Sequence, residues 1–259
     1  MLDEFPLDFS DSRNIKKYPA ANDLFQAGDS ELLNEAEAGL YHKFTAKGLF
    51  ASKRTRPDVQ QVISVLATRV KAPNISDWAK LEYLFMYFNG TRGDKLILSA
   101  DNLSVIKWHV DASFGVHPDF KSHTGISMTL GDGCPISNSR KQKLNTRSST
   151  EAELVGADDA ANMILWTKLF MEAQGHVIDQ NILYQDNKSA ILLEVNGKRS
   201  STKRTRALNL RYFFLTDQVE KGNLSIEYCP TDDMTADYFT KPLTGVKFRK
   251  FKLAIMGQL

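Results

Sequence analysis

The sequence predicts an α/β (α+β) fold, in which a small helical unit precedes a mixed sheet flanked by helices. Two observations support this fold class. Apolar residues recur at helical spacing through residues 31–93, whereas β-branched and aromatic runs begin after Gly93. Three expected strands are then followed by alternating helices and strands, an order typical of a mixed sheet with helices packed on its faces.

The first ninety residues divide into a lead and three helical segments. Residues 1–30 are polar and contain two prolines, so we expect an extended or poorly ordered lead. A first helix is expected over Leu32–Phe50. A second begins near Pro57, because proline fits a first helical turn, and a third begins after Ser76 as N-cap. Together these segments make residues 31–93 a small helical unit.

The remaining chain carries the expected sheet. Strands are expected at residues 104–111, 125–130, 135–137, 181–186 and 224–228. Helices are expected over 149–173, from 187 through 193, over 206–220, and from Asp232 onward. The sheet unit therefore begins near residue 104, after a boundary between residues 94 and 103.

The composition of the 259 residues excludes several classes of protein. Hydrophobic residues make up 42% and charged residues 25%, which excludes a wholly disordered chain. The net charge of +2 predicts a nucleic-acid partner only where basic residues cluster locally. Cys134 and Cys229 form no C-x-x-C pair, which excludes a disulfide scaffold and a thiolate zinc site. Without a membrane-length apolar run or a signal peptide, we expect an intracellular protein with no membrane partner.

Four carboxylates occupy positions where sheet enzymes place chemistry. Asp111 lies in an apolar strand, where a charge is costly unless it is paired or binds a cation. Asp186 ends a strand, while Glu153 and Asp237 lie in the first turns of expected helices. Such oxygen ligands suit Mg²⁺ or Mn²⁺. Taken singly, Asp186 could instead cap the next helix, and Glu153 and Asp237 could be ordinary first-turn acids.

Around these acids the chain resembles the ribonuclease H domain at the C-terminal end of Ty1/copia-type retrotransposon polyproteins. The matching strings are Val110–Ser113, Lys141–Lys143 leading into Ser148–Glu153, Asp186–Ala190, Arg211–Phe214 and Ala236–Leu243. Five strings in register over residues 105–245 make the resemblance specific. It assigns residues 104–245 to an RNase H-like domain and leaves 246–259 as a C-terminal basic helix.

The helical unit carries a second part of the resemblance. The segments Thr55–Asp58 and Tyr83–Thr91 are similar to the stretch that joins polymerase to RNase H in these polyproteins. Residues 31–93 would then be a remnant of the reverse transcriptase connection. The polymerase motif Tyr-x-Asp-Asp is absent, so we do not expect this chain to polymerise DNA.

The resemblance implies a five-stranded mixed sheet and a D-E-D-D site with two Mg²⁺ ions, for which Mn²⁺ could substitute. Asp111 would bridge both ions, Glu153 and Asp186 would complete one site, and Asp237 the other. Glu151 also fits the family string for the second acid. Ser148 as N-cap would place Glu151 at the reciprocal capping position, which favours Glu153 for the metal.

Two basic clusters are expected to contact nucleic-acid phosphates. One contains Lys203, Arg204, Arg206 and Arg211, between the third and fourth acids. Lys141 and Lys143 belong to the other, before the glutamate helix. Solvated surface loops are the simpler alternative for both clusters. Ala207 stands where the family usually has histidine, which leaves a backbone or substrate contact open.

The expected function is that of a ribonuclease H endonuclease that cleaves the RNA strand of RNA–DNA hybrids during retrotransposon reverse transcription. Expected partners are the hybrid and the polymerase domain of the same polyprotein, in a cytoplasmic retrotransposon particle or in the nucleus. A catalytically silent RNase H-fold module from a decayed element, acting in nucleic-acid binding or assembly, is the alternative. Ala207 favours it and the four acids oppose it. An integrase-like transferase is disfavoured, because the glutamate lies in the first helix after the strands.

Overall fold

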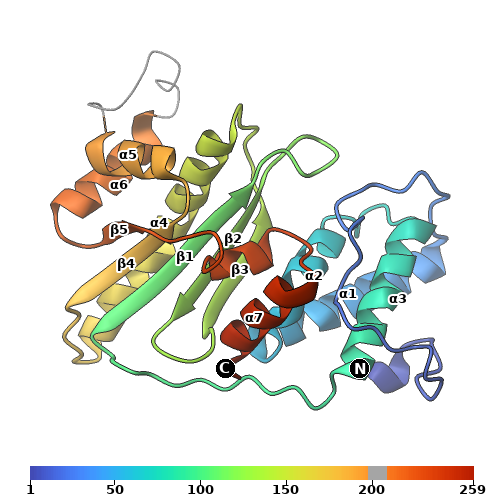
Figure 1. Ribbon diagram of the computed structural model, residues 1–259. Coiled ribbons are helices and arrows are strands. Elements are labelled where there is room, and N and C mark those ends of the chain that lie inside the picture. The colour runs from blue at the N-terminus through green and yellow to red at the C-terminus, as the bar shows by residue number, and fades with distance from the viewer. Residues whose placement is uncertain (198–208) are drawn as a thin grey trace.

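The computed structural model describes residues 1–197 and 209–259 and contains a five-stranded sheet (Figure 1). The strands are β1 (Val105–Ser113), β2 (His123–Thr129), β3 (Ile136–Lys141), β4 (Gln180–Gln185) and β5 (Ser225–Tyr228), in the spatial order β3-β2-β1-β4-β5. β1, β2 and β3 pair antiparallel, whereas β4 pairs parallel with β1 and β5 parallel with β4. The predicted mixed five-stranded sheet is confirmed.

Helix α4 (Ser149–Ala173) covers one face of the sheet, as its contacts with β1 and β2 show. Its bounds are those predicted from the sequence. At Gly156 the helix approaches the sheet so closely that a Cβ atom would lie 3.4 Å from Val110 and 3.5 Å from Thr124. Helices α5 (Lys188–Asn196) and α6 (Asn209–Glu220) pack together near α4, beside β4 and β5.

The helical unit consists of α1 (Glu35–Arg54), the short 3₁₀ helix η2 (Pro57–Val59), α2 (Gln60–Ala67) and α3 (Ile75–Gly90). The prediction of Ser76 as the N-cap of α3 is wrong. Asn74 caps this helix, because its side chain accepts the N–H of Asp77 while Asp77 accepts the N–H of Asn74.

The prediction of a helix that runs from Asp232 is also wrong. The chain forms a 3₁₀ helix, η5 (Thr235–Phe239), and then α7 (Gly245–Met256), which lies where a C-terminal basic helix over residues 246–259 was expected. Pro242 accounts for the break, since proline lacks an N–H and disfavours helical backbone in the residue before it. α7 lies between the sheet and α2 in Figure 1, and its buried residues Phe248, Phe251 and Ile255 join the core of the helical unit.

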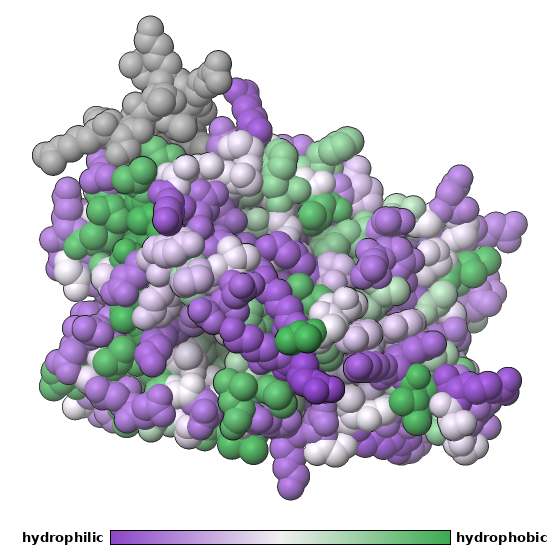
Figure 2. Space-filling view, viewed as in Figure 1, coloured by the Kyte–Doolittle hydropathy of each residue, from purple (hydrophilic) through white to green (hydrophobic). Residues whose placement is uncertain are grey.

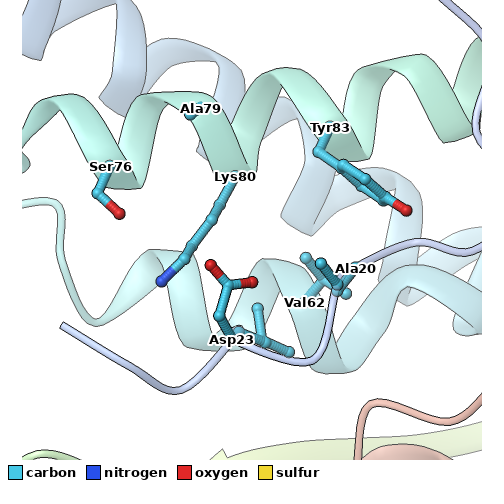
Figure 3. Close-up of a pocket in the computed structure, with 9 residues that line it drawn as sticks. Ala20, Asp23, Val62, Ser76, Ala79, Lys80 and Tyr83 are labelled. Carbon is cyan, nitrogen blue, oxygen red and sulfur yellow. The ribbon is translucent and has the colours of Figure 1, made fainter. Parts of the chain in front are cut away.

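The N-terminal lead contains the 3₁₀ helix η1 (Leu2–Glu4) and lies against the helical unit. Its residues Phe5 and Leu24 are buried in the same core, and the Phe5 ring stacks on Phe85 with centroids 4.0 Å apart. A pocket of about 190 Å³ separates part of the lead from α3. Figure 3 shows Asp23 and Lys80 pointing toward one another across it, and none of the four predicted acids lines it.

Side chains of the helical unit cover the edge strand β3. Gln60 of α2 donates to the backbone oxygen of Ser137 at 3.0 Å, and Lys53 of α1 donates to the same oxygen at 3.3 Å. The pairing edge of β3 is therefore blocked by helices rather than left open to another strand.

Hydrophilic side chains cover most of the face in Figure 2, with smaller hydrophobic groups between them. Among the described residues, no helix has both the length and the apolar character that crossing a bilayer requires.

Candidate metal-binding site

Three of the four predicted acids meet at one end of the sheet. Asp111 lies in β1, Asp186 directly follows β4, and Glu153 lies in the second turn of α4. One carboxylate oxygen from each lies within 4.8 Å of the others. Because β1 and β4 are parallel neighbours, their carboxyl-terminal ends bring Asp111 and Asp186 together, and the start of α4 adds Glu153. We call Asp111, Glu153 and Asp186 the acid trio.

Local capping separates Glu153 from Glu151. Ser148 caps α4 by accepting the N–H of Glu151 at 3.2 Å, as predicted. The Glu151 carboxylate turns back to accept the N–H of Arg147 at 2.7 Å, one residue earlier than a standard capping box. Glu151 thus belongs to the helix cap, and Glu153 is the glutamate that faces Asp111.

Asp186 does not cap α5. The N-cap of that helix is Asn187, whose side chain accepts the N–H groups of Ser189 and Ala190. Asp186 instead accepts the hydroxyl of Thr231 at 3.0 Å through its Oδ2 atom. This bond orients the carboxylate and leaves Oδ1 available for another ligand.

Burial makes the charges of the trio expensive. Burial raises the pKa of Glu153 well above the ordinary value, and the charges of Asp111 and Asp186 raise it further. Burial also raises the pKa of Asp111, although the neighbouring Lys241 opposes this shift. The Oε2 atom of Glu153 is buried and has no hydrogen-bond partner among the described residues. A divalent cation would supply the missing partner and relieve the repulsion, so the residues present fit a Mg²⁺ or Mn²⁺ ion.

The fourth predicted acid, Asp237, lies in η5 rather than in the first turns of a long helix, and it is not part of the trio. Its carboxylate is fully buried and accepts from two lysines, Lys241 at Oδ1 and Lys247 at Oδ2, each at 2.5 Å. Lys241 also lies 3.4 Å from Oδ2 of Asp111. The role of Asp237 as a metal ligand stays a prediction.

Gly125 allows η5 to approach the trio. It pairs with Asp111 across β1 and β2, and a Cβ atom there would lie 2.6 Å from the backbone oxygen of Ala236. Because a side chain would collide with η5, glycine is required at this position. The close approach lets the Thr240 hydroxyl donate to Oδ2 of Asp111.

Sequence reasoning missed Thr240, Lys241 and Lys247. Lys241 is four residues after Asp237, a spacing that can place two side chains on one helical face, and this was the available signal. Lys247 is on α7, and only the fold shows that this helix returns to the acids.

The predicted basic residues have different positions. Lys203, Arg204 and Arg206 lie outside the described residues, as does Ala207. Arg211 is in the first turn of α6. Lys143 is exposed beyond the end of β3, and Lys141 forms an ion pair with Asp119 at 2.7 Å. Gln142 between them is buried and donates to the backbone oxygen of Ala152, which anchors the start of α4.

No family model matches the chain. Among solved structures, similarity is found to an RNase H1 isolated from compost, with a TM-score of 0.40, 12% identity, and coverage of 53% of this chain and 93% of that chain. The RNase H1 of Halobacterium salinarum gives a TM-score of 0.36 and 15% identity, and covers 52% of this chain and 92% of that chain.

Curated relatives are transposon polyproteins. The retrovirus-related Pol polyprotein from transposon RE2 of Arabidopsis thaliana is 32% identical over 204 residues, which cover 78% of this chain and 14% of the relative. The corresponding protein from transposon TNT 1-94 of Nicotiana tabacum is 28% identical over 79% of this chain and 15% of the relative. The Ty1-NL2 Gag-Pol polyprotein of Saccharomyces cerevisiae is 27% identical over 77% of this chain and 12% of the relative.

The chain thus spans only 12–15% of the length of these relatives. The matches extend across plant and yeast elements of one type, and they agree with the resemblance seen in the motif strings. On this evidence the chain is a homologue of one segment of the Ty1/copia-type Pol polyproteins.

Proposed function

We propose that this chain is a divalent-cation-dependent ribonuclease H that cleaves the RNA strand of RNA–DNA hybrids during retrotransposon reverse transcription. The observation that carries the proposal is the acid trio with the buried, unpartnered oxygen of Glu153. A purely structural role would not explain three carboxylates held together without a partner for that oxygen.

In the proposed mechanism, Asp111, Glu153 and Asp186 hold the cation, and Asp237 takes part when a second ion is bound. Bound Mg²⁺ ions would activate water for attack on phosphorus and stabilise the charge on the leaving oxygen. Thr240 and Thr231 orient Asp111 and Asp186 through the hydrogen bonds described above. Burial of Glu153 excludes bulk water from one side of the site.

The proposed ribonuclease H function also implies partners. Lys141, Lys143 and Arg211, together with Lys203, Arg204 and Arg206, would contact phosphates of the hybrid without reading its base sequence. The relatives are polyproteins, so we propose that the polymerase domain of the same polyprotein is a second partner. The proposed location is a cytoplasmic retrotransposon particle, with the nucleus as the alternative.

The test is a cleavage assay with a hybrid that is end-labelled on its RNA strand. We expect Mg²⁺-dependent cleavage of that strand, loss of cleavage with EDTA, and no cleavage of duplex DNA. Asp111→Asn should reduce the rate by about 1,000-fold or more, equivalent to several kcal/mol of transition-state stabilisation. Asp233→Asn is the control, because this acid is exposed and, in the part of the chain that the structure describes, forms its ion pair with Lys250 at the surface.

Two results would contradict the proposal. Cleavage by Asp111→Asn at the wild-type rate would show that the site is misplaced. Tight binding of the hybrid without any cleavage under Mg²⁺ or Mn²⁺ would instead support the catalytically silent module.

A further inference from the structure

The space between Asp111 and Asp237 already contains a positive charge. The ammonium of Lys241 lies 2.5 Å from Oδ1 of Asp237 and 3.4 Å from Oδ2 of Asp111. Lys247 covers the other oxygen of Asp237 at 2.5 Å. Each oxygen of Asp237 therefore already accepts from a lysine ammonium group, which supplies the positive charge that a metal ion would otherwise bring.

The acid trio is different, because it has too little positive charge of its own. Oε2 of Glu153 is buried without a hydrogen-bond partner in the described part of the chain. The trio can accept a cation without displacing a side chain, whereas the position beside Asp237 can accept one only after Lys241 has moved away.

We propose that the protein without nucleic acid binds one divalent cation, at Asp111, Glu153 and Asp186, and that Lys241 occupies the place of a second. This inference deepens the proposed function, since it concerns the same site. Lys241 acts here as a positioning residue that controls how many ions the site holds.

The exposure of the two side chains permits such an exchange. The Lys241 side chain is 42% exposed, whereas that of Asp237 is 1% exposed. Lys241 can thus turn outward while the carboxylate stays in place. A phosphate of a bound hybrid is an alternative partner for its ammonium, so binding of nucleic acid would open the second position to an ion.

The proposal is tested by counting Mn²⁺ ions on the full chain without nucleic acid, by isothermal titration calorimetry and by electron paramagnetic resonance. We expect one bound ion for the wild type. Lys241→Met should bind two, with the spectrum of a coupled Mn²⁺ pair. Lys250→Met is the matched control and should bind one, because Lys250 is 48% exposed and pairs with the exposed Asp233.

Thermal unfolding provides a second readout. Without metal, Lys241→Met should melt below the wild type, because Asp111 and Asp237 then repel one another without a cation between them. Saturating Mn²⁺ should raise its melting temperature more than that of the wild type. Lys241→Gln, which keeps a polar side chain, should behave in the same way and guards against a variant that fails to fold.

The number of bound Mn²⁺ ions decides whether Lys241 occupies the second position. Two ions, or none, on the wild type would overturn the inference, as would one ion on a folded Lys241→Met or Lys241→Gln. The count is made without substrate, so it is independent of cleavage. A protein that binds two ions and cleaves hybrids would refute the inference alone, and one that binds one ion but never cleaves would refute the proposed function alone.

Discussion

Two buried carboxylates of this protein, Asp58 in the helical unit and Glu153 in the acid trio, have opposite surroundings. Asp58 receives two bonds of 2.8 Å from Arg56 and one of 2.7 Å from the Tyr87 hydroxyl. Oε2 of Glu153 receives none from the described residues. The fold neutralises the first acid with its own groups and leaves the second dependent on a ligand. The missing partner of Glu153 is therefore what distinguishes this buried acid from the structural Asp58.

The largest change in the free energy of unfolding is expected when Asp58, the acid that the fold neutralises, is replaced. Asp58→Asn leaves the Arg56 guanidinium buried without its counter-charge, so the free energy of unfolding should fall by about 3–5 kcal/mol. Urea unfolding measures the loss, and Mg²⁺ should not restore it. Asp233→Asn breaks a surface ion pair and should cost less than about 1 kcal/mol. A loss for Asp58→Asn as small as that for Asp233→Asn would show that Arg56 does not depend on Asp58 for its counter-charge.

At the acid trio, neutralising a carboxylate is expected to raise the free energy of unfolding rather than lower it. Because burial raises the pKa of Glu153, the folded protein binds its proton more tightly than the unfolded chain does. Its contribution to stability therefore falls as the pH rises above the ordinary pKa of glutamate. In EDTA, Glu153→Gln should raise the free energy of unfolding by about 1–3 kcal/mol at pH 8 and by much less at pH 4.5. A loss of stability at pH 8 would show that Glu153 is already compensated.

A smaller change should weaken the Asp58 network without breaking it. Tyr87→Phe removes one hydrogen bond but leaves Oδ2 of Asp58 bonded to Arg56. The expected loss is about 0.5–1.5 kcal/mol in urea unfolding. A loss as large as that of Asp58→Asn would mean that the tyrosine, rather than the arginine, satisfies the carboxylate.

The smallest effect is expected at Glu151, two residues from Glu153. Glutamine can still accept the N–H of Arg147, so Glu151→Gln should change stability by less than about 0.5 kcal/mol. Hybrid cleavage should stay near the wild-type rate, whereas Glu153→Gln should lose most of it. The reverse pattern of rates would move the assignment to Glu151.

Local sequence signals predicted the regular elements well. Helix α4 and the strands around Asp111 and Asp186 were found because capping residues and β-branched runs act over a few positions. The D-E-D part of the site followed from the motif strings, and the structure brings these three acids together. Their roles in catalysis remain predictions.

Contacts between distant segments could not be predicted in this way. Nothing local in residues 1–30 shows that Phe5 is buried among the helices, or that Lys247 reaches Asp237. The helix predicted from Asp232 was wrong because acidic and apolar residues there suit a helical first turn, whereas the chain forms only the short 3₁₀ helix η5. Tertiary packing decides each of these features, and a single sequence carries it only weakly.

The position of α7 has a consequence for the order of assembly during synthesis. Phe248 and Phe251 fill a core whose other members include Phe5 and Tyr41, more than two hundred residues earlier in the chain. During synthesis, the part of the helical-unit core that Phe248 and Phe251 fill stays uncovered until α7 has been translated, and contacts of such long range form slowly. Lys247 arrives on that same helix, so a chain that stops before residue 245 would leave Asp237 without one of its lysines. The core of the helical unit and the surroundings of Asp237 thus both depend on one helix, α7, which follows the sheet in the sequence.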